Sequence, residues 1–236
     1  MPESPRTDVR GARNGGRKMN DKTKRLTLMA MYAAMAFVLT AIGRFPISSM
    51  DFLKYDPKDV ILAICGLSMG PLPCLLVTVA VSLVEMVALS STGPIGFLMN
   101  VISSAAFACV ASAVYAHGRS LRRAVIGLIS GVIVMTGMML LWNYLITPLY
   151  MGTPREAVAA MLLPVFLPFN LIKGGINAAL TMLIYKPITR ALRSAHLLPE
   201  REDAPRANAA VKWTAIIAAI VLAGCIIAVL VIRHVI

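Results

Sequence analysis

The sequence predicts an all-α membrane protein that crosses the bilayer several times. Apolar residues make up 58% of the chain and charged residues only 14%, whereas charged residues account for about a quarter of an average soluble domain. The apolar residues form long runs separated by short polar stretches. Lys and Arg, which give the chain a formal net charge of +12, gather in three of those stretches. This pattern excludes a soluble domain and, despite the basic balance, argues against nucleic acid as a partner.

Seven apolar segments follow a polar basic tail over residues 1–25, which we expect to be disordered. Roughly 20 apolar residues span a bilayer as a helix. The second segment covers only about 15 Å as a helix, so we expect an unequal hairpin with the third, interrupted by GPLP at 70–73. The segments comprise residues 26–43, 60–69, 75–89, 96–116, 124–145, 163–185 and 213–232.

These segments predict two membrane units. Six of them form a substrate-binding membrane domain over residues 26–193, and a cytoplasmic linker over 194–212 leads to an extra transmembrane helix over 213–236. The composition of that last helix predicts a peripheral, lipid-facing position. We expect an irregular loop at 147–160, because Pro148, Gly152 and Pro154 interrupt it.

The distribution of Lys and Arg predicts the orientation. Basic residues precede the first segment, follow the fourth and follow the sixth, whereas the loops after the first and fifth segments carry charges of both signs. Loops rich in Lys and Arg remain in the cytoplasm. Seven crossings therefore place the N-terminus inside and the C-terminus outside.

The first outward loop, residues 44–59, reads RFPISSMDFLKYDPKD. It mixes bulky apolar side chains with charges of both signs, which favours a lid over a pocket rather than an exposed connector. We expect its charges to balance one another and Asp59 to help cap the helix that follows.

The sixth segment carries Asn170, Lys173 and Asn177 inside an apolar run. The spacings of three and four residues place all three on one helix face. An ionisable group at membrane depth is costly unless it is paired or faces a wet cavity, so this face predicts a pocket for a polar molecule. Glu85, the one carboxylate expected within the membrane, is either a structural ion-pair partner of Lys173 or a ligand contact. Asn143 either faces the pocket or reaches the membrane surface.

The chain lacks the motifs that carry enzyme chemistry. It contains no GxxxxGK[ST] loop for ATP and no HExxH. The remaining inventory of amides, one Lys and aromatic residues suits the binding of a small, flat molecule with a polar edge, because an amide can both donate and accept hydrogen bonds. We expect no enzyme activity, no metal and no cofactor.

Four stretches in order carry a family resemblance: FLKYDPKD after the first segment, GP after the second, WNYLITPLY at the end of the fifth and PFNLIKGGIN in the sixth. In this order and placement the chain resembles the riboflavin-specific substrate-binding (S) components of energy-coupling factor (ECF) vitamin transporters. The resemblance implies a six-helix S-component bundle in the cell membrane that captures riboflavin from outside. The seventh segment departs from that pattern.

The resemblance also implies site residues and partners. Asn143, Asn170 and Lys173 match the positions that contact the vitamin, and Leu53, Tyr55 and Asp56 match the loop that closes over it. Ala30 and Ala34 match the small-residue face that docks a transmembrane coupling subunit, which acts with two ATPases. From the residues alone, ordinary helix packing explains those alanines equally well.

Two other classes of function remain as alternatives. A self-sufficient carrier for a small polar solute is disfavoured by the scarcity of buried carboxylates, which proton-coupled carriers use. A membrane enzyme acting on a lipid is disfavoured by the absence of a nucleophile, a metal site or a diphosphate-binding cluster.

Overall fold

The computed structural model describes residues 21–46, 54–89, 93–195 and 209–235. Within those ranges six helical stretches are long and apolar enough to cross a membrane, which confirms the all-α membrane fold. The helices are α1 (Asp21–Gly43), α2 (Lys58–Met69), α3 (Pro71–Ala88), α4 (Gly93–Ala116), α5 (Leu121–Leu145), α6 (Thr147–Met151), α7 (Arg155–Met161), α8 (Leu167–Ser194) and α9 (Ala209–Val235). An antiparallel ribbon of β1 (Phe45–Pro46) and β2 (Lys54–Tyr55) lies between α1 and α2.

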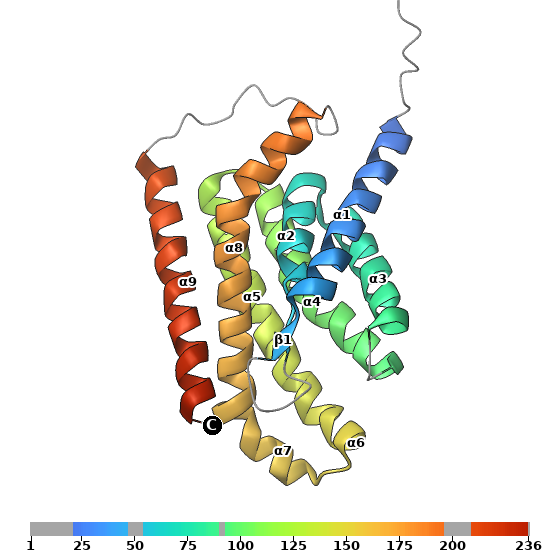
Figure 1. The fold of residues 1–236 in the computed structure, drawn as a ribbon, viewed down its shortest axis with the longest axis vertical. Helices are drawn as coiled ribbons and strands as arrows, with labels where there is room; N and C mark the ends of the chain where they lie inside the picture. The colour runs from blue at the N-terminus through green and yellow to red at the C-terminus, as the bar shows by residue number, and fades with distance from the viewer. Residues whose placement is uncertain (1–20, 47–53, 90–92, 196–208, 236) are drawn as a thin grey trace, which may run out of the picture.

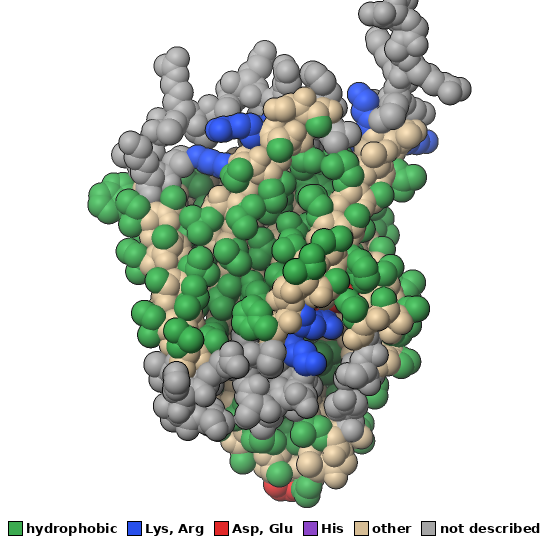
Figure 2. Space-filling view, in the orientation of Figure 1, with side chains coloured by type: hydrophobic (Ala, Val, Ile, Leu, Met, Phe, Trp, Pro, Cys, Tyr) green, Lys and Arg blue, Asp and Glu red, His purple; other side chains and the backbone are tan. Residues whose placement is uncertain are grey.

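The helices form an upright bundle (Figure 1). α1 begins and α8 ends at the same end of the bundle, whereas α9 ends at the opposite end. Basic side chains gather at the end where α1 begins (Figure 2). The basic residues of these helix ends are Lys22, Lys24 and Arg25 of α1 and Lys186, Arg190 and Arg193 of α8. α1 therefore begins and α9 ends at opposite ends of the bundle.

Two glycines of α5 allow it to pack directly on α4. A Cβ atom added at Gly127 or Gly131 would lie 2.5 Å from a backbone oxygen of α4, that of Ala111 or Phe107 respectively. Small residues four apart let two membrane helices approach this closely. The close contact fixes α5, and with it Asn143, against the bundle.

We expect Gly127→Ala to lower the free energy of unfolding by about 1 to 3 kcal/mol, because the added methyl group would overlap a backbone oxygen that cannot rotate away. Thermal unfolding of the purified protein in detergent measures the loss. Gly137→Ala is the matched control, since a Cβ atom there meets nothing within 4 Å. Equal melting temperatures for the two variants would contradict the close approach of α4 and α5.

The break between α2 and α3 is shorter than predicted. Only Gly70 interrupts the chain, with a φ of +101° that favours glycine. Pro71 already lies in the first turn of α3, where its missing N–H leaves no hydrogen bond unmade.

The connection after α5 is more regular than predicted. The expectation of an irregular loop is wrong, because α6 and α7 occupy it and a single π-helical turn, η1 (Leu162–Phe166), leads into α8. Pro148 lies in the first turn of α6 and Pro154 directly precedes α7. Proline is favoured at such positions, so these residues begin short helices rather than prevent them.

α8 also continues beyond its predicted end at Tyr185 and includes Pro187 within the helix. A proline inside a helix removes one hydrogen bond and bends the helix without having to end it. Figure 1 shows α8 bending toward its C-terminal end. Leu192 is buried in the hydrophobic core, which holds the last turns against the bundle.

α9 packs along α8 at the edge of the bundle (Figure 1). A Cβ atom added at Gly175 of α8 would lie 3.0 Å from Cys225 Sγ of α9, so glycine permits this contact. The opposite face of α9 is apolar and exposed, with Ile216, Ile220 and Ile227 at 49%, 65% and 60%. This is the peripheral position that the composition of the segment predicts.

Candidate functional site

The described residues that lead into α2 enter the bundle rather than remaining outside it. Phe45 of β1 pairs with Tyr55 of β2, and their ring centroids lie 5.1 Å apart. Tyr55 is 3% exposed and Phe45 42%, so the ribbon turns one ring inward. Asp56, which follows β2 directly, is buried. Leu53 lies outside the described residues, and the predicted closure of the loop over a pocket stays a prediction.

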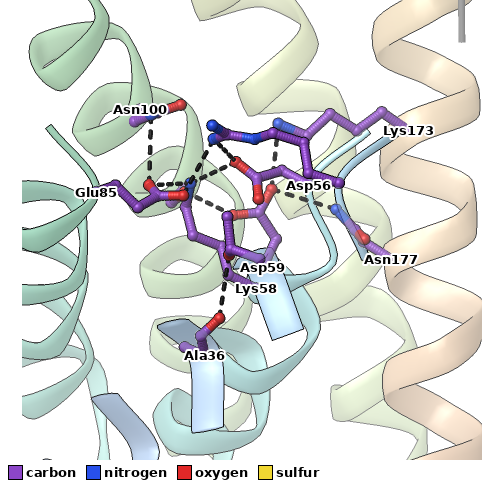
Figure 3. A network of polar contacts seen from close by, with 11 residues as sticks. Ala36, Asp56, Lys58, Asp59, Glu85, Asn100, Lys173 and Asn177 are labelled. Atoms are coloured by element: carbon purple, nitrogen blue, oxygen red, sulfur yellow. Dashed lines mark hydrogen bonds and ion pairs between the residues drawn. The ribbon is translucent and has the colours of Figure 1, made fainter. Parts of the chain in front are cut away.

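Arg44, Asp56, Lys58 and Glu85 form what we call the charge cluster. Figure 3 labels Asp56, Lys58 and Glu85. The Lys58 ammonium lies 2.5 Å from Asp56 Oδ2 and 2.6 Å from Glu85 Oε2. The Arg44 guanidinium lies 2.9 Å from the same Asp56 oxygen and 3.0 Å from Glu85 Oε1. Lys58, Asp56 and Glu85 are at most 3% exposed. Because buried charges are costly without partners, each member depends on the others.

Asp59 joins three helices beside the charge cluster. Its carboxylate accepts hydrogen bonds from Ser104 of α4 at 2.5 Å and from Asn177 Nδ2 of α8 at 3.2 Å, and Lys173 Nζ lies 3.3 Å away. The Tyr55 hydroxyl donates to Asn177 Oδ1 at 2.8 Å. The described polar contacts thus connect the ribbon, α2, α4 and α8 at one level of the bundle.

Three predictions about these charges are wrong. Glu85 does not pair with Lys173: its partners are Arg44 and Lys58, while Lys173 pairs with Asp59. Asp59 does not cap α2, since the N-cap residue is Pro57 and no side chain caps it. Finally, Glu85 is not the one buried carboxylate among helices. α2 is short and begins inside the bundle, so charges that the sequence places on an outer loop lie at depth.

The cationic neighbours keep Asp56 ionised. Burial by itself would raise the pKa of this carboxyl, but Lys58, Arg44 and Lys173 outweigh burial and hold the pKa well below its ordinary value. The pKa of Arg44 is raised because the nearby carboxylates outweigh its partial burial. Asp56 therefore contributes stability above the ordinary carboxyl pKa of about 4, and that contribution is lost as the pH falls further.

Asn143 of α5 and Asn170 of α8 are buried but make different contacts. Each side-chain amide donates to the carbonyl oxygen four residues earlier, at 2.7 Å in both cases. These bonds fix the amides, so each Oδ1 is turned away from that carbonyl. Asn143 Oδ1 accepts from Thr147 at 2.8 Å, whereas Asn170 Oδ1 has no partner among the described residues.

The structure brings five of the predicted site residues into two neighbouring sets of polar contacts. Asp56 and Glu85 meet through Arg44 and Lys58, whereas Tyr55, Asn177 and Lys173 meet around Asp59. Sequence reasoning missed the roles of Arg44 and Lys58, which it assigned to the outward loop as charges that balance its acidic residues. A usable signal was present: ten apolar residues at 60–69 are too few to cross a bilayer, which indicates a helix that begins inside the bundle and carries the charges just before it inward.

The site can bind through hydrogen bonds without presenting net charge. Arg44, Lys58 and Lys173 balance Asp56, Asp59 and Glu85. Across the described parts of the chain, no three His, Cys, Asp or Glu side chains are grouped to hold a metal ion.

A family model for the ECF transporter substrate-specific component matches residues 24–185. This chain belongs to that family. The match extends from the first turn of α1 into α8 and ends before α9. Members are transport subunits and not enzymes, and the apolar helices make this one a multi-pass protein of the plasma membrane.

Individual relatives agree with the family. The riboflavin transporter RibU of Staphylococcus aureus is 31% identical over 76% of this chain and 98% of its own length. The riboflavin transporter FmnP of Bacillus subtilis is also 31% identical, over 75% of this chain and 99% of its own. A solved S component of a bacterial ECF transporter superposes with a TM-score of 0.63 at 29% sequence identity. The superposition covers 73% of this chain and 99% of the solved chain.

Proposed function

We propose that this chain is the riboflavin-binding S component of an ECF importer. The observation that carries the proposal is the buried amine of Lys173 beside Asn170 on α8, in a chain that aligns with nearly the full length of two riboflavin transporters. A cation and an amide are retained at membrane depth when they serve a ligand. Riboflavin is a flat molecule with a polar ring edge and a hydroxylated chain, and both parts need such partners.

The binding residues we propose are those that match the vitamin-contacting positions of the family. Asn143, Asn170 and Lys173 would meet the polar atoms of the vitamin, and Tyr55 with Leu53 would cover its rings. The balanced charges around Lys173 support an uncharged ligand, because no described cation of this set is left without a carboxylate.

The remaining predicted residues have a supporting role in this proposal. Asp56 and Glu85 hold the charge cluster, and Asn177 links Tyr55 to Asp59. Contact of the vitamin with Tyr55 would therefore affect the position of the segment between α1 and α2. Such a connection suits a loop that closes over a captured ligand.

We also propose that uptake requires a transmembrane coupling subunit and two ATPases, because the chain has no ATP-binding motif of its own. The basic end of the bundle would face the cytoplasm. This orientation leaves the N-terminus inside, the C-terminus outside and the α6 and α7 end toward the supplied vitamin.

Titration with riboflavin tests the proposal. The detergent-purified protein is expected to bind riboflavin at one site and to quench flavin fluorescence. Flavin absorbance should also elute together with the protein peak during purification. A colourless protein that leaves flavin fluorescence unchanged would reject the assignment. Solute transport by this chain alone in vesicles would favour the alternative, a self-sufficient carrier.

Replacing Ala34 or Ala30 with Trp tests the proposed docking face. Both alanines lie on the exposed side of α1, so the larger ring should spare riboflavin binding yet lower cellular uptake severalfold by preventing close approach of the coupling subunit. Ala219→Trp on the exposed side of α9 is the control. Uptake that is equal in all three variants would reject docking through α1.

A further inference from the structure

The hydroxyl of Thr136, in the middle of α5, has no hydrogen-bond partner among the described residues, although the side chain is only 5% exposed. Other buried helix threonines behave differently. Each of Thr40, Thr78, Thr181 and Thr189 donates to the carbonyl four residues earlier. Thr136 therefore holds its hydroxyl away from its own backbone, and a buried polar group without a partner is costly.

Thr136 lies on the face of α5 that carries Asn143. The two residues are seven apart, which is close to two full helical turns. Val132, one turn before Thr136, contacts α8: its Cγ1 would be 2.8 Å from a Cβ atom added at Gly174. The unpaired hydroxyl is thus one turn away from a close α5–α8 contact, on the side toward Asn143.

The same count on α8 leads to Asn170. The two helices run in opposite directions (Figure 1), so moving four residues forward from Val132 and four back from Gly174 reaches the same level of the bundle, about 6 Å from the contact. Thr136 and Asn170 therefore lie at one level on two packed helices. Asn170 Oδ1 also has no partner among the described residues, and no hydrogen bond joins it to Thr136.

We propose that Thr136 is a ligand-binding residue that, with Asn170, receives the imide edge of the flavin ring. This inference rests on the proposed function and extends it to one further residue. The imide edge presents an N–H flanked by carbonyl oxygens. The fixed Asn170 Oδ1 accepts from the N–H, and the Thr136 hydroxyl donates to a neighbouring carbonyl. The Thr136 hydroxyl and Asn170 Oδ1 then each gain a hydrogen-bond partner.

Riboflavin titration of three variants tests this assignment. Thr136→Val keeps the shape and removes the hydroxyl, and it is expected to raise the Kd about tenfold while the ligand-free protein melts no lower than the parent. Thr136→Ser keeps the hydroxyl and should retain most of the affinity. Thr78→Val is the matched control, since that buried hydroxyl is already satisfied by its own helix. Lumiflavin, which has the ring but no ribityl chain, should show the same Thr136→Val ratio.

Each of the other possible outcomes contradicts a different part of the proposal. If the parent binds riboflavin and Thr136→Val binds it equally well, the residue does not touch the ligand. Equal losses in the Val and Ser variants would indicate altered packing instead of a lost hydrogen bond. A loss with riboflavin but not with lumiflavin would move the contact from the ring edge to the ribityl chain and reject the edge assignment. A parent that binds no flavin would reject the proposed function itself.

Discussion

The Lys58→Met variant is expected to be about 3 to 5 kcal/mol less stable than the parent, or to fail to accumulate in the membrane. Lys58 is 1% exposed and pairs with both Asp56 and Glu85. Removing one partner of a buried ion pair leaves uncompensated charge in a medium of low dielectric constant. Thermal unfolding in detergent, or the yield of monodisperse protein, measures the effect.

A control and a double variant make this result specific. Lys54→Met removes an exposed Lys from the same segment and should change stability little. Glu85→Gln in the Lys58→Met background removes one of the carboxylates left without its partner. The stability loss of the double variant should therefore be smaller than the sum of the losses of the two single variants. If Lys58→Met melts like Lys54→Met, the charge cluster does not stabilise the fold.

Lys173→Met is expected to weaken riboflavin binding about 10- to 100-fold while leaving the protein folded. A hydrogen bond to a charged group contributes about 1.5 to 3 kcal/mol, and the variant removes the Lys173 ammonium that would donate such a bond to the vitamin. The fold should survive because Asp59 still accepts hydrogen bonds from Ser104 and Asn177. Fluorescence titration gives the affinity.

Lys186→Met provides the comparison for this prediction. Lys186 lies on the same helix toward its C-terminal end, away from the residues that contact Asp59. Its replacement should leave the Kd unchanged. Titration curves of Lys173→Met that overlay those of the parent would show that the vitamin binds elsewhere in the bundle.

Several features of the fold follow from the sequence because they depend on composition over many residues. Long apolar runs identify membrane helices with little ambiguity, since every backbone polar group must be satisfied within the segment. The helix around Asn170 and Lys173 and the peripheral helix over 213–232 are of this kind. The ends of helices were less predictable: prolines at 148, 154 and 187 suggested breaks, yet two begin short helices and one lies within α8.

The partners of the charged residues could not be predicted in this way. Sequence spacing relates residues on one helix, whereas the pairs of Glu85 with Lys58 and of Asp59 with Lys173 join residues 27 and 114 positions apart. Which pairs form depends on the depth at which α2 begins and on the faces that α3 and α8 turn toward it.

The sequence by itself determined the membrane class, the family, the polar face of α8 and the position of the basic residues at one end of the bundle. Each of these is a property of one segment or of a run of residues in order. Only the tertiary structure decided that Asp56, Lys58 and Asp59 lie inside the protein and which charges neutralise one another. It also decided that the Thr136 hydroxyl and Asn170 Oδ1 have no hydrogen-bond partner among the described residues. The physical reason is that burial and pairing arise between helices, where a short element such as α2 carries charged residues to a depth that its own composition does not reveal.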